Sequence, residues 1–273
     1  MHGGLLMKRI ISILLTLILS ISLFACVAEE ESSSISDYAP PNYTHKLTAE
    51  QGGGTLTFID GHAESAVISD YSGPSAIHTV KIPPVISDAD REVTGIGDRA
   101  FYQVPTIKEV ILPDTVTFIG EMAFAGCTQL EKIVIPASVT YIDKYAFYGC
   151  TSLKSVTFKG QELELIGDYA FLDCPALDTI TLPEGLEEIG NWAFGNCASI
   201  KSLKTPSTLK KIGTLAFSGC EGLNVKNGLT LSASIKEIGE FAFVGIDKNN
   251  INAPEGSFAA DYVAKMAEEE EET

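Results

Sequence analysis

Residues 119–142 read IGEMAFAGCTQLEKIVIPASVTYI, and residues 142–158 start the same pattern again as IDKYAFYGCTSLKSVTF. The dipeptide Ala-Phe occurs seven times, always with its alanine four residues after an isoleucine, at intervals of 23, 23, 24, 23, 23 and 26 residues. The seven copies are Ala100-Phe101, Ala123-Phe124, Ala146-Phe147, Ala170-Phe171, Ala193-Phe194, Ala216-Phe217 and Ala242-Phe243. A period of this length is typical of proteins built from stacked structural units, so the repeat decides the fold.

Each unit combines a turn with a short strand. Glycine follows the isoleucine in every copy except one, where Asp143 stands, and the next residue is polar or charged. This pattern predicts a tight turn that leads into one or two helical turns. Further along the unit, Leu130, Ile133 and Ile135 show the spacing of a strand with one buried face. The carboxylates expected to accept N–H groups at the helical turns are Asp98, Glu121, Asp168 and Glu240.

The whole unit, C-x-x-L-x-x-I-x-L-P-x-x-L-x-x-I-G-x-x-A-F, runs through residues 112–243 and resembles the BspA-like leucine-rich repeats of bacterial surface proteins. The resemblance implies an α/β solenoid: a right-handed leucine-rich-repeat superhelix or horseshoe with a parallel β-sheet on the concave face and short helical turns on the other. Since one unit cannot bury its own apolar face, successive units are expected to stack, with the repeat phenylalanines in a continuous column.

The N-terminus has the pattern of an export signal. Lys8 and Arg9 precede an apolar run of residues 10–24, which is too short to span a membrane comfortably. The sequence Leu23-Phe24-Ala25-Cys26 resembles a bacterial lipobox, which implies cleavage before Cys26 and lipid attachment to that cysteine. Two or more acyl chains hold a protein stably on a membrane. The alternative is an ordinary secretory signal with an accidental cysteine. The start codon is Met1 or Met7.

These patterns predict five segments. Residues 1–25 form a lipoprotein signal peptide and residues 26–52 a polar, lipidated tether. Residues 53–95 hold an N-terminal cap hairpin around Asp60-Gly61 and an irregular first repeat. Residues 96–252 are the BspA-like repeats, and residues 253–273 are a C-terminal cap helix with an acidic tail.

Charge and composition exclude one class of function. The chain has 273 residues, with 19 Lys and Arg against 36 Asp and Glu, and a formal net charge of −17. Such a balance argues against a protein that binds nucleic-acid phosphates. The 45% share of hydrophobic residues favours a globular body with a core.

Five of the six cysteines occupy one slot, three residues after the repeat phenylalanine. Val104 and Ile246 fill that slot in the first and last copies, so the slot is expected to hold a small buried apolar group. An oxidised pair between adjacent copies and a site for a thiophilic metal are the alternatives. We expect no metal and no cofactor. The five cysteines are Cys127, Cys150, Cys174, Cys197 and Cys220.

Histidine placement disfavours an enzyme. Beyond the signal, the histidines are His45, His62 and His78, and all precede the regular repeats. A catalytic triad with histidine therefore cannot form within the array. Paired carboxylates of a glycosidase type are the remaining catalytic option. The alternative function is thus an accessory or enzymatic protein that acts on surface polysaccharide.

The outward residues of the predicted strands form the candidate binding face. They include six lysines and three acids, which opposes the charge of the whole chain. We expect this face to bind a protein or glycoprotein on a host or neighbouring cell, with the membrane reached through Cys26. The plainer interpretation is that Lys, Thr and Val simply suit exposed strands. The candidate partner-binding residues are Lys81, Lys108, Ile111, Lys132, Val134, Lys154, Thr157, Thr181 and Lys204.

A second candidate surface is the residue before each Ala-Phe pair, which is often aromatic. Stacked aromatic rings can bind sugars, although they more often pack over the next turn of a solenoid. The sequence therefore predicts an exported, non-enzymatic adhesion or recognition module on the cell surface. The slot holds Tyr145, Tyr169, Trp192 and Phe241, with Arg99, Met122 and Leu215 in the other copies.

Overall fold

A computed structural model describes residues 43–46, 51–61, 65–86 and 89–271. By its internal contacts the chain divides into two units: Pro41–Val263, and Met1–Pro40 together with Ala264–Thr273. The repeats lie in the first unit. The predicted signal peptide, Cys26 and nearly all of the tether lie outside the described residues. Within the described ranges, no helix has both the length and the apolar character needed to cross a membrane.

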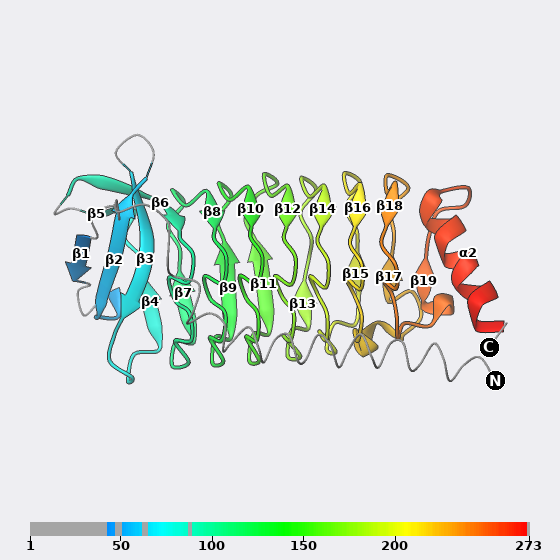
Figure 1. Ribbon diagram of the computed structural model, residues 1–273, viewed down its shortest axis with the longest axis horizontal. Coiled ribbons are helices and arrows are strands. Elements are labelled where there is room, and N and C mark those ends of the chain that lie inside the picture. The colour runs from blue at the N-terminus through cyan, green and yellow to red at the C-terminus, as the bar shows by residue number, and fades with distance from the viewer. Residues whose placement is uncertain (1–42, 47–50, 62–64, 87–88, 272–273) are drawn as a thin grey trace, which may run out of the picture. The chain divides into compact units, whose positions relative to one another are not determined.

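The repeats form a parallel β-solenoid of about eight turns. Its strands stand side by side along the first unit (Figure 1). One continuous sheet, which we call the back sheet, contains the isoleucine that precedes each turn. In order, its strands are β1 (Tyr43–Lys46), β2 (Thr55–Asp60), β3 (Ala66–Ser72), β6 (Arg91–Ile96), β8 (Phe118–Ile119), β10 (Tyr141–Ile142), β12 (Leu165–Ile166), β14 (Glu188–Ile189), β16 (Lys211–Ile212) and β18 (Glu237–Ile238), with β5 (Val85–Ile86) paired to β6.

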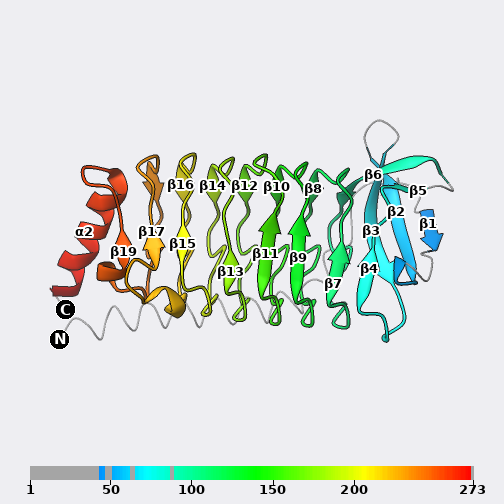
Figure 2. The same ribbon diagram turned by 180° about the vertical axis from the view of Figure 1, so that it is seen from behind.

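Two further parallel sheets, which we call the front sheets, contain the strands predicted from the alternating pattern. They are visible from both sides in Figures 1 and 2. The first has the order β13 (Thr179–Ile180), β11 (Ser155–Phe158), β9 (Lys132–Ile135), β7 (Glu109–Ile111), β4 (Thr79–Lys81). The second has the order β15 (Leu203–Lys204), β17 (Leu229–Thr230), β19 (Ile251–Asn252).

The two ends of the array are formed by different elements. β2 and β3 pair antiparallel, and the N–H of Gly61 donates to the carbonyl of Ser65 at 2.8 Å. At the other end, helix α2 (Phe258–Glu271) follows the last turn, and the Tyr262 hydroxyl donates to the Gly239 carbonyl at 3.0 Å. Each end of the stack is thus met by an element that is not itself a repeat.

The prediction of helical turns on the far side of the repeats is wrong. In the described part of the array, helix is limited to the single 3₁₀ turns Glu221–Leu223 and Lys248–Asn250. Elsewhere the Ala-Phe segment is a series of tight turns; in one copy the Ala123 N–H donates to the Gly120 carbonyl at 3.2 Å. The side opposite the front sheets carries the back sheet instead. The horseshoe curvature stays a prediction.

The reason lies in the backbone of the residue before each Ala-Phe pair. All seven copies have φ between 54° and 59°, in the left-handed region, which a right-handed helix cannot include. Bonds between turns hold this conformation: the Met122 N–H donates to the Lys144 carbonyl at 3.1 Å, and the Phe124 N–H donates to the Ala146 carbonyl at 2.7 Å. The seven residues are Arg99, Met122, Tyr145, Tyr169, Trp192, Leu215 and Phe241.

Asp98 and Asp168, two of the four carboxylates that were expected to cap helical turns, instead link neighbouring turns. Asp98 Oδ1 accepts the backbone N–H of Glu121 at 2.9 Å. Asp168 Oδ1 accepts the N–H of Asn191 at 2.6 Å, 23 residues further along the chain. A carboxylate that accepts an N–H from the next repeat helps to fix the stacking distance.

The core is the expected column of phenylalanines. All seven repeat phenylalanines are 0% exposed, and neighbouring rings stack with centroids 5.0–6.0 Å apart. This spacing is close to the distance of about 4.8 Å between paired strands. Tyr71 of β3 stacks on Phe101 at 5.2 Å, and Tyr262 of α2 meets Phe243 edge-on at 5.8 Å. The column therefore ends against an aromatic ring on each side.

The front of the solenoid has one discontinuity. No strand pairing joins β13 to β15 among the described residues, whereas the back sheet crosses the same point through β14 and β16. Thr205 lies just beyond β15 in the inward slot that Leu182 fills one turn earlier, and it is only 1% exposed. Its N–H donates to the Thr230 carbonyl, and its hydroxyl accepts the Ser232 N–H at 2.8 Å. Thr205 thus binds the following turn.

Candidate functional site

The front sheets present their outward residues as predicted. In β9, Lys132 and Val134 are exposed, while Ile133 and Ile135 are buried. All nine candidate partner-binding residues are exposed. The register places Lys81 beside Ile111, and Val134 beside Thr157, so that side chains of equivalent position form rows across the strands.

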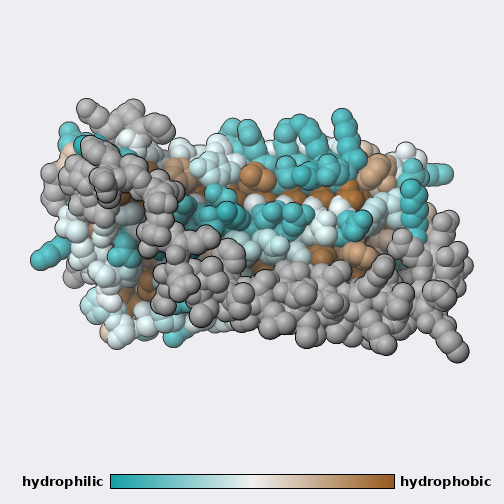
Figure 3. Space-filling model, viewed as in Figure 1, coloured by the Kyte–Doolittle hydropathy of each residue, from teal (hydrophilic) through white to brown (hydrophobic). Residues whose placement is uncertain are grey.

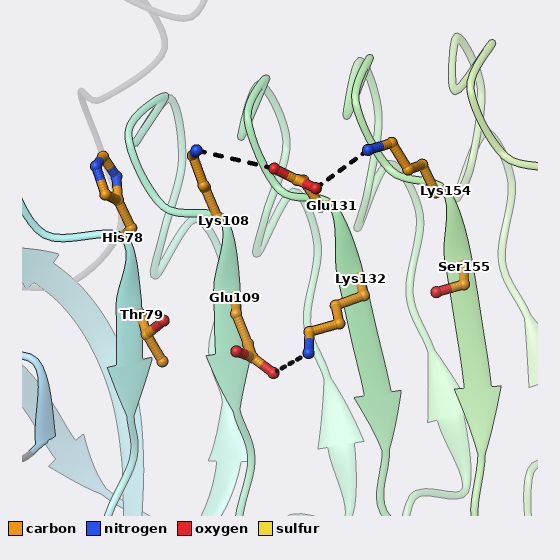
Figure 4. Close-up of a pocket in the computed structure, with 8 residues that line it drawn as sticks. All are labelled: His78, Thr79, Lys108, Glu109, Glu131, Lys132, Lys154 and Ser155. Atoms are coloured by element: carbon orange, nitrogen blue, oxygen red, sulfur yellow. Dashed lines mark hydrogen bonds and ion pairs between the residues drawn. The ribbon is translucent and has the colours of Figure 1, made fainter.

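The lysines of the first front sheet are paired with carboxylates from neighbouring turns (Figure 4). Glu131 lies between Lys108, at 3.9 Å, and Lys154, at 3.1 Å. Lys132 and Glu109 form a second ion pair at 2.9 Å. The hydrogen bond and charge of Lys154 hold the pKa of Glu131 below its ordinary value. This part of the face is therefore a lattice of both charges and not the cationic stripe that the residue count indicated.

An open depression of about 390 Å³ lies over this lattice. His78 stands at one end, and its Nδ1 donates to the Thr106 carbonyl at 3.0 Å, which fixes the ring. Figure 4 shows that the side chains around the depression come from four neighbouring strands, β4, β7, β9 and β11, and the residues just before them. Its lining residues are His78, Thr79, Lys108, Glu109, Glu131, Lys132, Lys154 and Ser155.

Sequence reasoning missed the role of the acidic residues in this depression. Glu109 and Glu131 were counted only as charges against the lysines. Their spacing in the sequence could have revealed this role. A distance of 23 residues, the length of one repeat, separates Lys108 from Glu131 and Glu109 from Lys132. Residues one repeat apart become neighbours on adjacent strands, so opposite charges at that offset predict ion pairs.

The structure does not bring every candidate residue together. Thr181 follows β13 at the end of the first front sheet, whereas Lys204 belongs to β15 in the second. Hydrogen bonds from Ser207, followed by the charge of Lys204, lower the pKa of Glu184. Lys204 therefore lies in a different electrostatic setting from the lysines of the depression.

The aromatic slot before Ala-Phe mainly covers the turns. Tyr145 and Tyr169 stack at 4.6 Å with an angle of 3°, and Trp192 is only 6% exposed. Burial, followed by the neighbouring Tyr169, raises the pKa of Tyr145 to about 12. Tyr148 meets Tyr145 edge-on at 6.0 Å. These contacts favour the packing interpretation of this slot over sugar binding.

The five cysteines form a row of buried, free thiols. The Cys127 Sγ donates to the carbonyl of Phe101 at 3.1 Å, and Cys174 Sγ donates to that of Phe147 at 3.2 Å. Burial raises the pKa of the thiols of Cys127 and Cys220 to about 12. Nucleophilic and metal-binding chemistry needs the thiolate, so the row is suited to packing. Across the described residues no three or more His, Cys, Asp and Glu side chains gather as metal ligands would.

The repeat geometry agrees with the comparisons with known proteins. Residues 94–224 match the family model of the BspA type leucine rich repeat region, in six copies. The repeat region of the chain is therefore of the BspA leucine-rich-repeat type. A comparison with curated proteins gives no match.

Solved structures with similar repeats come from several bacteria. The chain is 27% identical to a T. pallidum leucine rich repeat protein, covering 80% of this chain and 95% of that one, with a TM-score of 0.65. It is 28% identical to a leucine rich cell surface protein from Faecalibacterium prausnitzii, covering 80% of this chain but 56% of that one, with a TM-score of 0.63. A Bacteroides ovatus leucine-rich repeat protein is also 28% identical, with coverages of 77% and 57% and a TM-score of 0.51.

Proposed function

We propose that this protein is a recognition and adhesion module on the bacterial cell surface. In this proposal its front sheets bind a protein or glycoprotein on a host or neighbouring cell, and lipidated Cys26 holds it on the membrane. The similarity to a leucine rich cell surface protein from Faecalibacterium prausnitzii supports the location. The rows of exposed side chains on a rigid sheet support binding and not catalysis.

The depression over β4, β7, β9 and β11 is the observation on which the proposal depends. Three lysines and two glutamates meet there, and inter-turn ion pairs hold all five. Exposed ion pairs of this kind contribute little to stability, so the fold does not require them. Fixed charges of both signs give specificity for a partner with the complementary pattern. A protein surface offers such a pattern, whereas a polyanion does not.

A charge swap tests this role of the depression without removing an ion pair. The variant Glu109→Lys with Lys132→Glu keeps the pair and the net charge but reverses the pattern in the depression. The matched control is Glu187→Lys with Lys210→Glu, an exposed pair beside the back sheet. The measurement is binding of the labelled full chain to layers of cultured epithelial cells and to bacterial cells.

We expect the swap in the depression to reduce cell binding at least tenfold, while the control swap leaves it unchanged. Circular dichroism and urea unfolding confirm that both variants fold. Equal binding by the two variants, at low and at physiological salt, would reject the depression as the contact surface.

The membrane anchor is tested separately. Replacement of Cys26 by serine removes the sulfur that carries the lipid, so the protein should leave the membrane fraction or stay uncleaved. Fractionation of cells that express the full chain, with metabolic labelling by a fatty acid, measures both outcomes. Membrane association and labelling that persist in Cys26→Ser would support the ordinary secretory signal in place of the lipoprotein one.

A further inference from the structure

The outer side of the back sheet carries an uncharged row that the proposed function does not use. The register pairs Ile59 with Val67, Val67 with Gly95, Gly95 with Phe118, Phe118 with Tyr141, and Tyr141 with Leu165. Beyond Leu165 the same row becomes charged, with Glu188, Lys211 and Glu237. Figure 3 shows hydrophobic residues between rows of hydrophilic ones over the repeats. We call the surface formed by the rings of Phe118 and Tyr141, together with the neighbouring Leu165, the aromatic shelf.

The two rings of the aromatic shelf stack on each other. Phe118 and Tyr141 stack with centroids 5.5 Å apart and an angle of 9°. A Cβ atom at Gly95 would lie 2.3 Å from the Phe118 ring, so this ring rests against the backbone of Gly95. Tyr141 is 38% exposed, and Phe118 and Leu165 are partly exposed. The result is an apolar surface of fixed geometry that remains accessible to water.

Threonine hydroxyls border the shelf on the side that precedes each short strand. The Thr117 hydroxyl donates to the Thr94 carbonyl at 3.0 Å, and the Thr140 hydroxyl donates to the Thr117 carbonyl at 3.3 Å. Because each hydroxyl proton already forms a hydrogen bond to a backbone carbonyl, the hydroxyl oxygen can only accept a hydrogen bond from a ligand. Both threonines are exposed.

Carboxylates border the shelf on the side that follows each strand. Asp98 Oδ1 accepts the Glu121 N–H at 2.9 Å, and Asp143 Oδ1 accepts the Lys144 N–H at 2.7 Å. These bonds fix both carboxylates and use one oxygen of each. Burial, followed by the charges of Asp143 and Asp98, raises the pKa of Tyr141.

From this arrangement we infer that the aromatic shelf binds a neutral pyranose ring of a polysaccharide. A pyranose has one face rich in C–H groups, which packs on aromatic rings, and hydroxyl groups around its edge. The shelf supplies the rings, and its borders supply acceptors for hydroxyl protons at Asp98, Asp143 and Thr140. Among the described residues at this border, Asp98, Asp143 and Glu121 stand against a single cation, Lys144, which pairs with Glu121 at 3.1 Å. The excess of negative charge disfavours acidic sugars because like charges repel.

The size of the shelf argues against a second copy of this chain as the occupant. Stable protein interfaces bury about 1,200–2,000 Å² in total, with about 20–30 residues on each side. The shelf comprises three partly exposed side chains, and the charged residues Glu164 and Glu188 follow at its end. A flat ligand the size of one or two sugar rings fits that extent.

The test uses the full chain and neutral hexasaccharides of β-linked glucose, β-linked mannose and β-linked N-acetylglucosamine, measured by isothermal titration calorimetry. An oligogalacturonate of the same length is the acidic comparison. Tyr141→Thr removes the exposed ring and puts in its place a β-branched residue, which also favours strands. Asp143→Asn keeps the shape of a border residue but removes its charge. The control is Tyr102→Ala, because Tyr102 is an equally exposed tyrosine, 40% exposed, outside the shelf.

We expect at least one neutral hexasaccharide to bind, with affinity at least tenfold lower in Tyr141→Thr, severalfold lower in Asp143→Asn and unchanged in Tyr102→Ala. The charge swap at Glu109 and Lys132 should leave sugar binding intact, which separates this inference from the proposed cell contact. Absence of binding to all three neutral sugars, equal binding of the acidic one, or wild-type affinity in Tyr141→Thr would overturn it. Self-association that Tyr141→Thr abolishes would instead identify a second copy as the occupant.

Discussion

Replacement of Phe171 by alanine should lower the free energy of unfolding by about 3–5 kcal/mol. Phe171 is 0% exposed, and it stacks on Phe147 at 5.0 Å and on Phe194 at 5.3 Å. Each lost ring pair adds about 0.5–1.5 kcal/mol beyond the loss of buried area. The Phe171 N–H donates to the Ala193 carbonyl at 2.7 Å, and such bonds fix the distance between turns. The gap therefore cannot close, which favours the upper part of the range.

Equilibrium unfolding of the full chain in urea measures this loss. Trp192 is the only tryptophan and is buried one turn from Phe171, so its fluorescence reports on the affected region. Circular dichroism reports on the whole array, and agreement of the two signals checks that the array unfolds cooperatively. The matched control is Phe243→Ala at the end of the column, where Phe217 is 6.0 Å away and Tyr262 meets the ring edge-on. Phe243→Ala should cost less. A loss below about 1 kcal/mol for Phe171→Ala, or a larger loss for Phe243→Ala, would refute the reasoning.

Three further predictions concern the thiols, the turns and the links between turns. Burial raises the pKa of the Cys127 and Cys220 thiols to about 12, so the folded state holds protons that the unfolded state releases above about pH 8.5. The contribution of these thiols to the free energy of unfolding should therefore be complete below that pH and fall as the pH rises toward 12. In addition, the five repeat thiols should react with a thiol reagent at pH 8 only after urea is added. Reaction of these thiols in the folded protein would contradict the prediction. Gly149 has φ of 67°, and a Cβ atom added there would meet nothing within 4 Å. Gly149→Ala should therefore lower the free energy of unfolding by about 1 kcal/mol through backbone strain alone, and Gly149→Asn should lower it less. Equal losses for the two variants in urea unfolding would point to a different cause. Asp168→Ala removes hydrogen bonds to the backbone and side chain of Asn191 at 2.6 and 3.2 Å and should cost about 1–2 kcal/mol, whereas an unchanged urea midpoint would show that water replaces them.

The sequence predicted those features that depend on burial. The alternation around Ile133 and Ile135 placed inward and outward residues correctly, because a strand with one buried face must alternate. The phenylalanine column followed from the repeat itself, since stacked units place equivalent side chains one above another. Neither inference needed information from outside the unit.

Features that depend on backbone conformation or on neighbouring units were harder to predict. Bulky residues such as Tyr145 and Trp192 rarely adopt a left-handed φ, and only bonds from the adjacent turn hold them there, so a single unit resembled the start of a helix. The residue count indicated a cationic stripe because it did not compare residues one repeat apart, where Glu131 meets Lys154. Likewise, the apolar Leu182 is replaced one turn later by Thr205, whose hydroxyl accepts the N–H of Ser232 in the following turn.

The interruption between β13 and β15 has a mechanical consequence under the proposed anchoring at a cell surface. At this point the back sheet and the phenylalanine column continue, but the front sheets share no strand pairing among the described residues. At this point strand pairing resists tension along the stack in the back sheet only. The array is therefore expected to open first on the side of the front sheets, between β13 and β15. Stretching with optical tweezers should reveal a first rupture that leaves two folded blocks, one on each side of the Thr181 and Lys204 gap.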